Sequence, residues 1–377
     1  MAQVTLGDVA IESRETYKGD KSGMPIVGLE HLIPEDVVLS LWDRDKENTF
    51  TKMFRKGDML FGRRRAYLKK AAQAPFDGIC SGDITVIRAK EDRLIPELLP
   101  FIIQNDVLFD FAVGKSAGSL SPRVKWENLK NYKFELPPLS EQKKLAEALW
   151  AINDTLQAYQ KLLIETDELV KSQFIEMFGS ISKTKTLSDL AEMVTVGIAN
   201  SATHAYVNDG VLMFRNQNIK ANELDDSDLI YIKPEFAKKY ESKTLKANDI
   251  LVARTGYPGT ACLVPDKYAG AQTFTTLIVR MKQLPDLLPA FVCQYINSPD
   301  GQGYVKENEA GSAQLNFGAT ALSKMPIILP PLDLQEKYLA FVEQSDKSKF
   351  ALQNAISAAR ETKRSIIADA LGIKGKE

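Results

Sequence analysis

A run of cations between residues 52 and 70 is the part of the sequence with the clearest chemistry. Asp58 is the only acid in this run, and Phe54, Phe61 and Tyr67 stand among the cations. Guanidinium groups pair with phosphates or donate two hydrogen bonds to O6 and N7 of guanine, a contact called a fork. Aromatic rings can add stacking contact with bases. A charge run is usually a solvated face, but three adjacent arginines after a strand pattern favour nucleic-acid contact. The residues assigned to this contact are Arg63, Arg64, Arg65, Tyr67, Lys69 and Lys70.

Two segments of the second half carry side chains of similar chemistry. In one, an arginine again follows a strand pattern and stands beside glycines, which let the backbone approach a partner or simply form a turn. Its candidates are Arg254, Thr255 and Tyr257. The other is a polar run in which Asn and Gln have the geometry to fork onto adenine, although a plain polar loop explains it equally well. Its candidates are Arg215, Asn216, Gln217, Asn218 and Lys220.

A pair of Ser/Gly-rich segments precedes the two Pro-Pro sequences of the chain. Small hydroxyl residues with exposed amides and a few cations suit a phosphate backbone, and a Ser/Gly connector is the alternative. The candidates in the first segment are Lys115, Ser116, Ser119, Arg123 and Lys125. Those in the second segment are Ser312, Gln314 and Asn316.

No catalytic motif accompanies these candidates. The sequence lacks a Walker A loop, a dinucleotide-binding glycine fingerprint and an adenine-methyltransferase Asn-Pro-Pro-Tyr or Asp-Pro-Pro-Tyr motif. His31 and His204, the only histidines, lie in different halves, and the three cysteines are widely separated. We therefore expect no catalytic residue, no bound metal and no disulfide framework, with buried reduced thiols.

The elements that position these residues are marked by a repeat. Leu-Pro-Pro-Leu occurs at 136–139 and again at 329–332, an offset of 330 − 137 = 193 residues, or about half the chain. Prolines give an extended approach to a helix, and Ser140 and Asp333 are favoured N-caps. Shorter echoes, such as Asp58-Met-Leu and Asp249-Ile-Leu, extend the repeat into the segments before the helices. The chain is thus one domain plus one long helix, used twice.

Apolar residues recur at heptad spacing after each Pro-Pro sequence. The first seam predicts a helix of roughly 38 residues, about 57 Å long. Its packing residues are Leu145, Leu149, Ile152, Leu156, Tyr159, Leu163 and Val170. The second seam is weaker, because Ser345, Lys349 and Lys363 fall at apolar positions and indicate a shifted register or partial packing. Its packing residues are Val342, Leu352, Ile356 and Ile366. We expect an antiparallel pair; two unrelated helices are the alternative.

The globular segments mix short strands with few helices, which predicts a mixed α/β (α+β) fold rather than a doubly wound sheet. Strands are expected at 24–29, 59–61 and 84–87, and a helix at 98–111. The expected organisation is a globular domain at 1–138, a long helix at 139–179, a second globular domain at 180–331 and a second long helix at 332–377.

Bulk properties bound the class of protein. The 377 residues contain 48 Lys and Arg against 49 Asp and Glu, so nucleic-acid binding must come from local clusters of charge. The start of the chain lacks the pattern of a signal peptide, and no apolar run is long enough to cross a bilayer. A cytoplasmic protein without a membrane partner is expected.

Together these features resemble the DNA-specificity subunit of type I restriction-modification systems, across essentially the whole chain. The residues that carry the resemblance are Ser121-Pro-Arg-Val-Lys-Trp-Glu-Asn-Leu, Phe134-Glu-Leu-Pro-Pro-Leu-Ser-Glu-Gln-Lys-Lys-Leu-Ala and Leu329-Pro-Pro-Leu-Asp-Leu-Gln-Glu. Pro-Pro-Leu alone would be a weak signal, but its duplication with a long helix is specific.

The resemblance implies two target recognition domains joined by an antiparallel helix pair. Each domain would read one half of a bipartite site in double-stranded DNA, and the helices would set the gap and dock two methyltransferase subunits. S-adenosylmethionine and adenine N6 methylation would belong to those subunits, and a separate motor and nuclease subunit would complete the complex. This chain itself would bind no cofactor and catalyse nothing.

Two other functions remain open from the sequence. One is a specificity-like subunit that serves a different DNA-methylation system, and the other is a non-enzymatic coiled-coil adaptor whose globular ends bind protein. Salt-dependent binding to duplex DNA separates a DNA reader from an adaptor.

Overall fold

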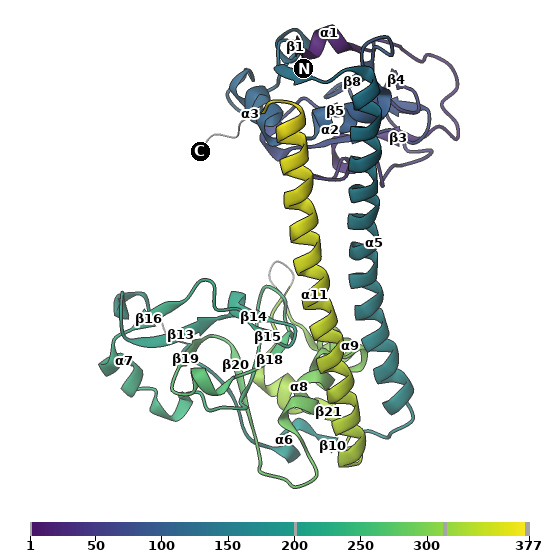
Figure 1. Ribbon diagram of the computed structural model, residues 1–377. Helices are drawn as coiled ribbons and strands as arrows, with labels where there is room; N and C mark the ends of the chain where they lie inside the picture. Colours follow the sequence, from purple (N-terminus) through teal and green to yellow (C-terminus); the bar gives the residue numbers. More distant parts are fainter. Residues whose placement is uncertain (1, 200–201, 312–314, 374–377) are drawn as a thin grey trace. The chain divides into compact units, whose positions relative to one another are not determined.

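The computed structural model describes residues 2–199, 202–311 and 315–373 (Figure 1). The chain divides into two compact units. The first contains the N-terminal part of the chain as far as Leu162 and resumes at Ala351, and the second contains the residues from Leu163 to Phe350. Each unit therefore consists of one globular domain together with a segment of both long helices.

Three small sheets build the domain of the first unit. A four-stranded antiparallel sheet has the order β2-β8-β5-β6, a three-stranded sheet has the order β3-β7-β4, and β1 pairs with β9. The strands span Ala2–Thr5 (β1), Ala10–Glu12 (β2), Ile26–Val27 (β3), Lys52–Phe54 (β4), Met59–Gly62 (β5), Ala71–Gln73 (β6), Gly78–Cys80 (β7), Ile84–Ala89 (β8) and Lys133–Leu136 (β9). The strands expected from Met59 and Ile84 are present, and the one expected near Met24 is reduced to two residues.

The helices of this domain are short. They span Leu6–Val9 (α1), Leu29–His31 (η1), Ala66–Leu68 (η2), Pro96–Leu98 (η3), Leu99–Ile103 (α2), Asp106–Gly114 (α3) and Trp126–Leu129 (α4). The single helix expected over 98–111 is wrong, because the chain breaks between α2 and α3. Asn105 takes an extended backbone there and caps α3 by accepting a hydrogen bond from the Leu108 N–H at 2.8 Å.

The second domain repeats the order of the first. Its main sheet is β11-β20-β17-β18, and β10 pairs with β21 as β1 pairs with β9. It also has a sheet β12-β16-β13-β19 and the ribbon β14-β15; β13 and β19 are parallel, as are β3 and β7. The strands span Lys185–Thr186 (β10), Ala191–Val196 (β11), Tyr206–Val207 (β12), Val211–Arg215 (β13), Ile219–Lys220 (β14), Glu223–Leu224 (β15), Ile230–Ile232 (β16), Ile250–Val252 (β17), Ala261–Leu263 (β18), Gln272–Phe274 (β19), Leu277–Met281 (β20) and Pro326–Ile327 (β21).

Helices of the second domain cover its sheets and connect its strands. They span Leu187–Leu190 (α6), Thr203–Ala205 (η4), Asn216–Asn218 (η5), Pro234–Lys238 (α7), Glu241–Lys243 (η6), Asp266–Tyr268 (η7), Pro289–Asn297 (α8), Pro299–Asn308 (α9) and Ala319–Ser323 (α10). With short helices and mostly antiparallel sheets in both domains, the expected α+β class is confirmed.

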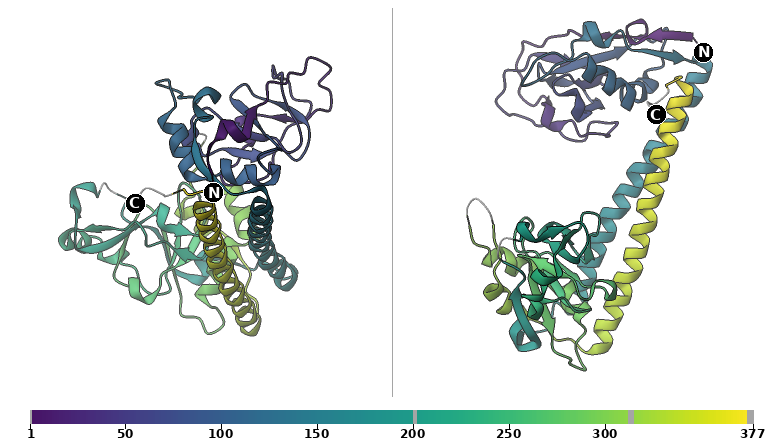
Figure 2. Two further views of the ribbon diagram at one scale, coloured as in Figure 1. Left: turned by 45° about the horizontal axis from the view of Figure 1, so that its top comes forward. Right: turned by 90° about the vertical axis from the view of Figure 1, so that its left-hand side faces the viewer.

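The two long helices are α5 (Leu139–Phe178) and α11 (Leu332–Ala370), which lie side by side (Figures 1 and 2). In the second unit Phe174 and Phe178, late in α5, pack against Tyr338, early in α11, with ring centroids 5.4 Å apart in both pairs. In the first unit Leu149, early in α5, shares a buried cluster with Ile367, late in α11. The helices are therefore an antiparallel pair, and the alternative of two unrelated helices is wrong.

The expected seams face inward on both helices. Every packing residue assigned to α5 or α11 is buried or half-buried. The second seam keeps its expected positions along α11, so a shifted register does not explain its polar residues. Partial packing fits them better, because the seam is mostly half-buried between Lys349 and Ile366 and joins the apolar clusters only near the two ends of the helix. Ser345 donates to the Phe341 carbonyl, and the Lys349 ammonium lies 3.2 Å from Asp167 of α5 and 2.7 Å from Asp346.

One buried glutamine ties the start of each long helix to its domain. The Gln142 Oε1 accepts the Ile95 N–H at 3.0 Å, and its Nε2 donates to the carbonyls of Arg93 and Pro137. Gln335 makes the same three bonds in the second unit, to Leu288 N–H and to the Asp286 and Pro330 carbonyls. The glutamine of the Leu-Pro-Pro-Leu-x-x-Gln repeat is thus a structural clamp.

A buried carboxylate and an arginine join the central strands in each domain. The guanidinium of Arg88 donates to both oxygens of Asp58 at 2.7 and 2.8 Å, and Arg280 makes the same paired contact with Asp249 at 2.9 and 2.7 Å. Asp58 is 2% exposed and Asp249 is 1% exposed. The Asp58 carboxylate holds the pKa of Arg88 above its ordinary value. An ion pair between a buried aspartate and a strand arginine is therefore common to the scaffold of both domains.

Replacing the clamp should destabilise each unit by similar amounts. In Gln142→Ala the half-buried Ile95 N–H and two carbonyls lose their partner. Each lost hydrogen bond costs about 0.5–1.5 kcal/mol, so we expect a destabilisation of about 2–4 kcal/mol. Gln335→Ala should cost the same. Denaturant-induced unfolding measures the change, with Gln353→Ala on the exposed face of α11 as the control. Unfolding curves that match the control would show that the glutamines do not hold the helix starts.

Candidate nucleic-acid interface

The candidate segments of the first domain come together after β5. The Val124 N–H donates to the Arg63 carbonyl at 2.9 Å, and the Arg65 N–H donates to the Pro122 carbonyl at 2.8 Å. The Arg64 Nε also donates to the Ser121 hydroxyl at 3.0 Å. The arginines at 63–65 and the Ser-rich segment at 115–125 therefore form one surface, which we call the first arginine surface.

Asp83 organises the cations of this surface. The Arg123 guanidinium donates to both Asp83 oxygens at 2.7 and 3.2 Å, and the Arg64 guanidinium lies 3.6 Å from the same carboxylate. The hydrogen bonds from Arg123 hold the pKa of Asp83 below its ordinary value, so the carboxylate is ionised at neutral pH. One negative charge thus orients two cations, and the surface stays positive.

Arg63 has an unused donor on this surface. Its Nε is buried and has no hydrogen-bond partner among the residues that the structure describes. A buried donor without a partner is costly, and such groups are rare in folded proteins. The site therefore lacks an acceptor, which a phosphate or a base edge would supply.

The remaining cations of the run between residues 52 and 70 do not belong to one surface. Arg55 pairs with Glu15 and Asp77, each at 3.0 Å, and the half-buried Lys52 donates to the Ile84 carbonyl at 2.7 Å. Burial lowers the pKa of Lys52. These two cations, which were not among the assigned contact residues, lie apart from the first arginine surface because the strands β4 and β5 enter different sheets.

Lys69 and Lys70 are also held within the domain. Lys69 forms an ion pair with Asp106, and the Lys70 ammonium donates to the Leu29 carbonyl at 2.8 Å. Tyr67 is half-exposed beside them, and Leu120 in the Ser-rich segment is 91% exposed. A DNA contact by Tyr67, Lys69, Lys70, Lys115, Ser116, Ser119 or Lys125 stays a prediction.

Three candidate segments of the second domain converge on Arg254. The Arg254 N–H donates to the Asn216 Oδ1 at 2.7 Å, and its Nε donates to the Asn316 Oδ1 at 2.9 Å. The Phe317 N–H donates to the Arg254 carbonyl, as Val124 does to Arg63. Arg63 and Arg254 thus occupy equivalent places, each directly after a central strand. We call the group around Arg254 the second arginine surface.

A glycine-containing loop beside this surface exposes an aromatic ring. Gly256 and Gly259 have φ values of 82° and 81°, a left-handed conformation that glycine adopts without strain. Between them Tyr257 is 81% exposed, and Thr255 is half-buried. A ring so exposed is available for stacking. Ser312 and Gln314 lie outside the described residues.

The polar run at 215–220 is organised by Asp228, which sequence reasoning missed. Arg215 and Gln217 both donate to its Oδ2 at 2.7 Å, and Lys220 lies 3.9 Å from Asp225. Arg215 keeps a buried Nε that has no partner within the described residues. The first arginine surface and the segment at 215–220 therefore each contain an acid that orients at least one arginine, and each contains a buried arginine Nε without a partner among the described residues.

Asn218 is a correction to the expected set. It is 1% exposed, its Oδ1 accepts the Arg215 N–H at 2.9 Å, and its Nδ2 donates to the carbonyls of Asp225 and Asp228. With its polar atoms engaged and its surface covered, Asn218 supports the loop rather than offering an amide to a base.

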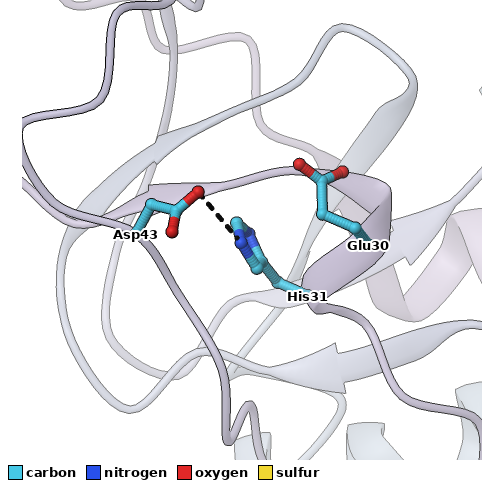
Figure 3. Close-up of side chains that lie close together, drawn as sticks. All are labelled: Glu30, His31 and Asp43. Atoms are coloured by element: carbon cyan, nitrogen blue, oxygen red, sulfur yellow. Dashed lines mark ion pairs between the residues drawn. The ribbon is translucent and has the colours of Figure 1, made fainter. Parts of the chain in front are cut away.

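A group of metal-ligating side-chain types, Glu30, His31 and Asp43, meets in the first domain within the described residues (Figure 3). The His31 Nδ1 accepts the Gly28 N–H at 2.9 Å, so the neutral ring carries its proton on Nε2, which lies 3.3 Å from Asp43. Both nitrogens are engaged, and the geometry is that of a histidine that holds a loop.

The cysteines offer no nucleophile. Cys80, Cys262 and Cys293 are buried, and burial raises the pKa of Cys80 and of Cys262 to about 12. The thiols therefore stay protonated at neutral pH. Among the described residues no helix combines the length and apolar character needed to span a bilayer.

Comparisons with known proteins agree with this geometry. The family model described as "Type I restriction modification DNA specificity domain" matches residues 1–166 and again residues 181–360. Two specificity subunits from Escherichia coli are similar in sequence. The type I restriction enzyme EcoDI subunit is 30% identical over 28% of this chain, and the EcoBI subunit is 22% identical over 62% of it. These matches span 23% and 56% of the relatives' own length.

A solved structure shares the fold. It is described as the structural basis underlying complex assembly and conformational transition of the type I R-M system. The match has a TM-score of 0.60 and 18% identity, and covers 98% of this chain and 97% of the other. At that identity the likeness shows the fold alone. With the family's domain present in each half, the chain belongs to the type I restriction modification DNA specificity family.

Proposed function

We propose that this chain is the DNA-recognition subunit of a type I restriction-modification complex, in which each domain contacts one half of a bipartite target. The observation that carries the proposal is the equivalent placement of Arg63 and Arg254 in two copies of a DNA-specificity domain. Both arginines follow a central strand and meet the segment that precedes a Pro-Pro sequence. Repetition of this arrangement favours a shared task over a chance charge cluster.

The two surfaces differ in the side chains they offer. The first presents arginines around Asp83, whereas the second combines Arg254 with the amides of Asn216 and Asn316. Arginine forks prefer guanine, and Asn or Gln amides prefer adenine. Each well-formed fork favours the correct base over a wrong base by about 1–3 kcal/mol. The specificity for the whole target would then be the sum of modest contributions from the two domains. The two domains would accordingly read different half-sites.

The chemistry of modification would belong to other subunits. We propose that two methyltransferase subunits, which bind S-adenosylmethionine, dock on the long helices, and that a motor and nuclease subunit completes the complex. Docking is supported by large apolar side chains exposed on the helices within the second unit. These residues are Ile164, Leu169, Ile175 and Phe350. Exposed apolar surface of this kind is typical of an interaction site.

The arginine contacts can be tested by paired substitutions in the complex with its methyltransferase subunits. Arg63→Ala and Arg254→Ala should each weaken DNA binding by roughly 5–150-fold, the equivalent of about 1–3 kcal/mol, and each should relax one half-site only. Filter binding to variant duplexes over a salt series measures both effects. Arg14→Ala, which removes a highly exposed arginine outside the surfaces, serves as the control.

Lysine variants distinguish the two kinds of contact. Arg63→Lys keeps the charge but loses the fork, so a phosphate contact would retain the salt dependence of binding, whereas a guanine fork would lose selectivity. Unchanged affinity and unchanged selectivity in the alanine variants would contradict the assignment of both surfaces. Salt-independent binding of the intact chain would favour the protein-binding adaptor instead.

Docking on the helices predicts a second set of variants. Ile164→Arg combined with Ile175→Arg places charge on the exposed apolar side of α5 and should abolish co-purification of the methyltransferase subunit. Gln344→Arg adds charge on the exposed surface of α11 in the same unit and should leave complex formation intact. Retention of the methyltransferase by the double variant would exclude this side of α5.

Mapping of methylated adenines tests the proposed function as a whole. Co-expression of this chain with its methyltransferase subunits should produce methylation at a bipartite sequence with an unread gap. Exchange of one domain should change only one half of that sequence. Methylation at a continuous motif, or at none, would contradict the proposal that the two domains read separate half-sites.

A further inference from the structure

The first unit contains a cavity of about 410 Å³ between its domain and the long helices. Its walls come from the loop after η1, the junction of α2 and α3, and the facing parts of α5 and α11. This volume is within the range of sites that hold small molecules. The DNA contacts proposed above involve none of the residues that line it.

Two hydrogen-bond donors in this cavity lack acceptors. Asn153 of α5 is 4% exposed, and its Nδ2 has no partner within the described residues. Lys363 of α11 lines the same cavity and is half-buried, and none of the hydrogen bonds or ion pairs found among the described residues involves its ammonium. Burial lowers the pKa of Lys363. A buried amide N–H without an acceptor is costly, and a half-buried ammonium beside it would gain from an acceptor in the cavity.

The acids near the cavity are already engaged. Glu35 lies 3.2 Å from Arg360 and 3.6 Å from Arg364, and Asp106 pairs with Lys69. Asp36 accepts the Ser40 hydroxyl at 2.9 Å. Glu35 and Asp106 are thus paired with other cations and Asp36 with a neutral hydroxyl, and among the described residues no carboxylate is found in contact with the Lys363 ammonium or the Asn153 amide.

The rest of the wall is largely apolar. Ile33, Val37, Val107, Leu156 and Ile367 line the cavity beside the two donors. From this combination we propose that the cavity binds a small amphipathic carboxylate. Its anionic head would accept from the Lys363 ammonium and the Asn153 amide, and its hydrocarbon body would lie against the apolar wall. A carboxylate offers two oxygens, one for each donor.

The two donors of the cavity occur in one half of the chain. At the repeat offset of 193 residues, Asp346 corresponds to Asn153 and Val170 corresponds to Lys363. Asp346 bonds with Lys349, and Val170 packs on the apolar core of the second unit. The two donors are therefore absent from the equivalent positions, so their presence in the first unit is not required by the shared scaffold. The site suits a ligand-binding role added to one copy.

Binding of octanoate to the full-length chain tests the proposal. Calorimetry and ligand-observed NMR should detect octanoate, while acetate, which lacks the hydrocarbon body, and 1-octanol, which lacks the charge, should bind at least tenfold more weakly. Lys363→Met and Asn153→Leu should each weaken octanoate binding about tenfold or more, because a hydrogen bond to a charged group is lost.

Lys349→Met is the matched control. It removes the other half-buried lysine of the α11 seam, which bonds with Asp167 and Asp346 and does not line the cavity, so octanoate should still bind. Lys363→Met should fold at least as stably as the parent, because an ammonium disfavoured by burial is removed. Thermal unfolding checks this and separates lost binding from lost folding.

Three results would overturn the proposal. Equal binding of octanol and octanoate would show that the cavity selects no carboxylate. Undiminished octanoate binding by Lys363→Met would place the ligand elsewhere. Absence of octanoate binding to a folded parent chain would show that the cavity does not bind such a carboxylate and that ordered water accepts from the two donors instead.

Discussion

A buried glutamine in the first turn of each long helix is bound by the loop of its own domain. Gln142 and Gln335 satisfy one backbone N–H and two carbonyls apiece, at the point where the chain leaves the Pro-Pro sequence and becomes helical. A proline nitrogen has no hydrogen to donate, so the glutamine side chain supplies polar contacts between helix and domain that the Pro-Pro backbone does not make by itself. The direction in which a helix leaves its domain, and hence the seam it presents to its partner, depends on this clamp.

The duplicated contacts separate scaffold from recognition surface. The glutamine clamps and the pairs Asp58–Arg88 and Asp249–Arg280 are the same in both domains. The loops around Arg63 and Arg254 keep one backbone hydrogen bond in common and otherwise differ in their polar side chains. A shared framework with dissimilar loops allows two copies of one domain to bind different partners.

The spacing of apolar residues in the sequence was sufficient to predict the packing faces of the long helices. It was insufficient to predict which distant residues meet in the loops. The heptad positions in α5 and α11 were predictable because inward-facing residues recur every three or four positions, and Lys349 follows that spacing despite its charge. Asp83 and Asp228 gave no such signal, since each meets its arginine through contacts without period. The break between α2 and α3 at Asn105 could not be predicted for another reason. Apolar residues continue on both sides of Asn105, and in the sequence this N-cap cannot be distinguished from a polar residue on the exposed face of one continuous helix.

The ion pair between Lys349 and Asp167 has a further consequence for the alignment of the helices. Apolar seams tolerate sliding by one heptad, because one leucine layer resembles the next. Displacement of α11 by seven residues would take the Lys349 ammonium away from the Asp167 carboxylate, toward the position of Phe174 in one direction and of Gln160 in the other, and neither side chain carries a charge. That offset is penalised electrostatically, so a single charged layer selects one alignment where hydrocarbon alone would permit several.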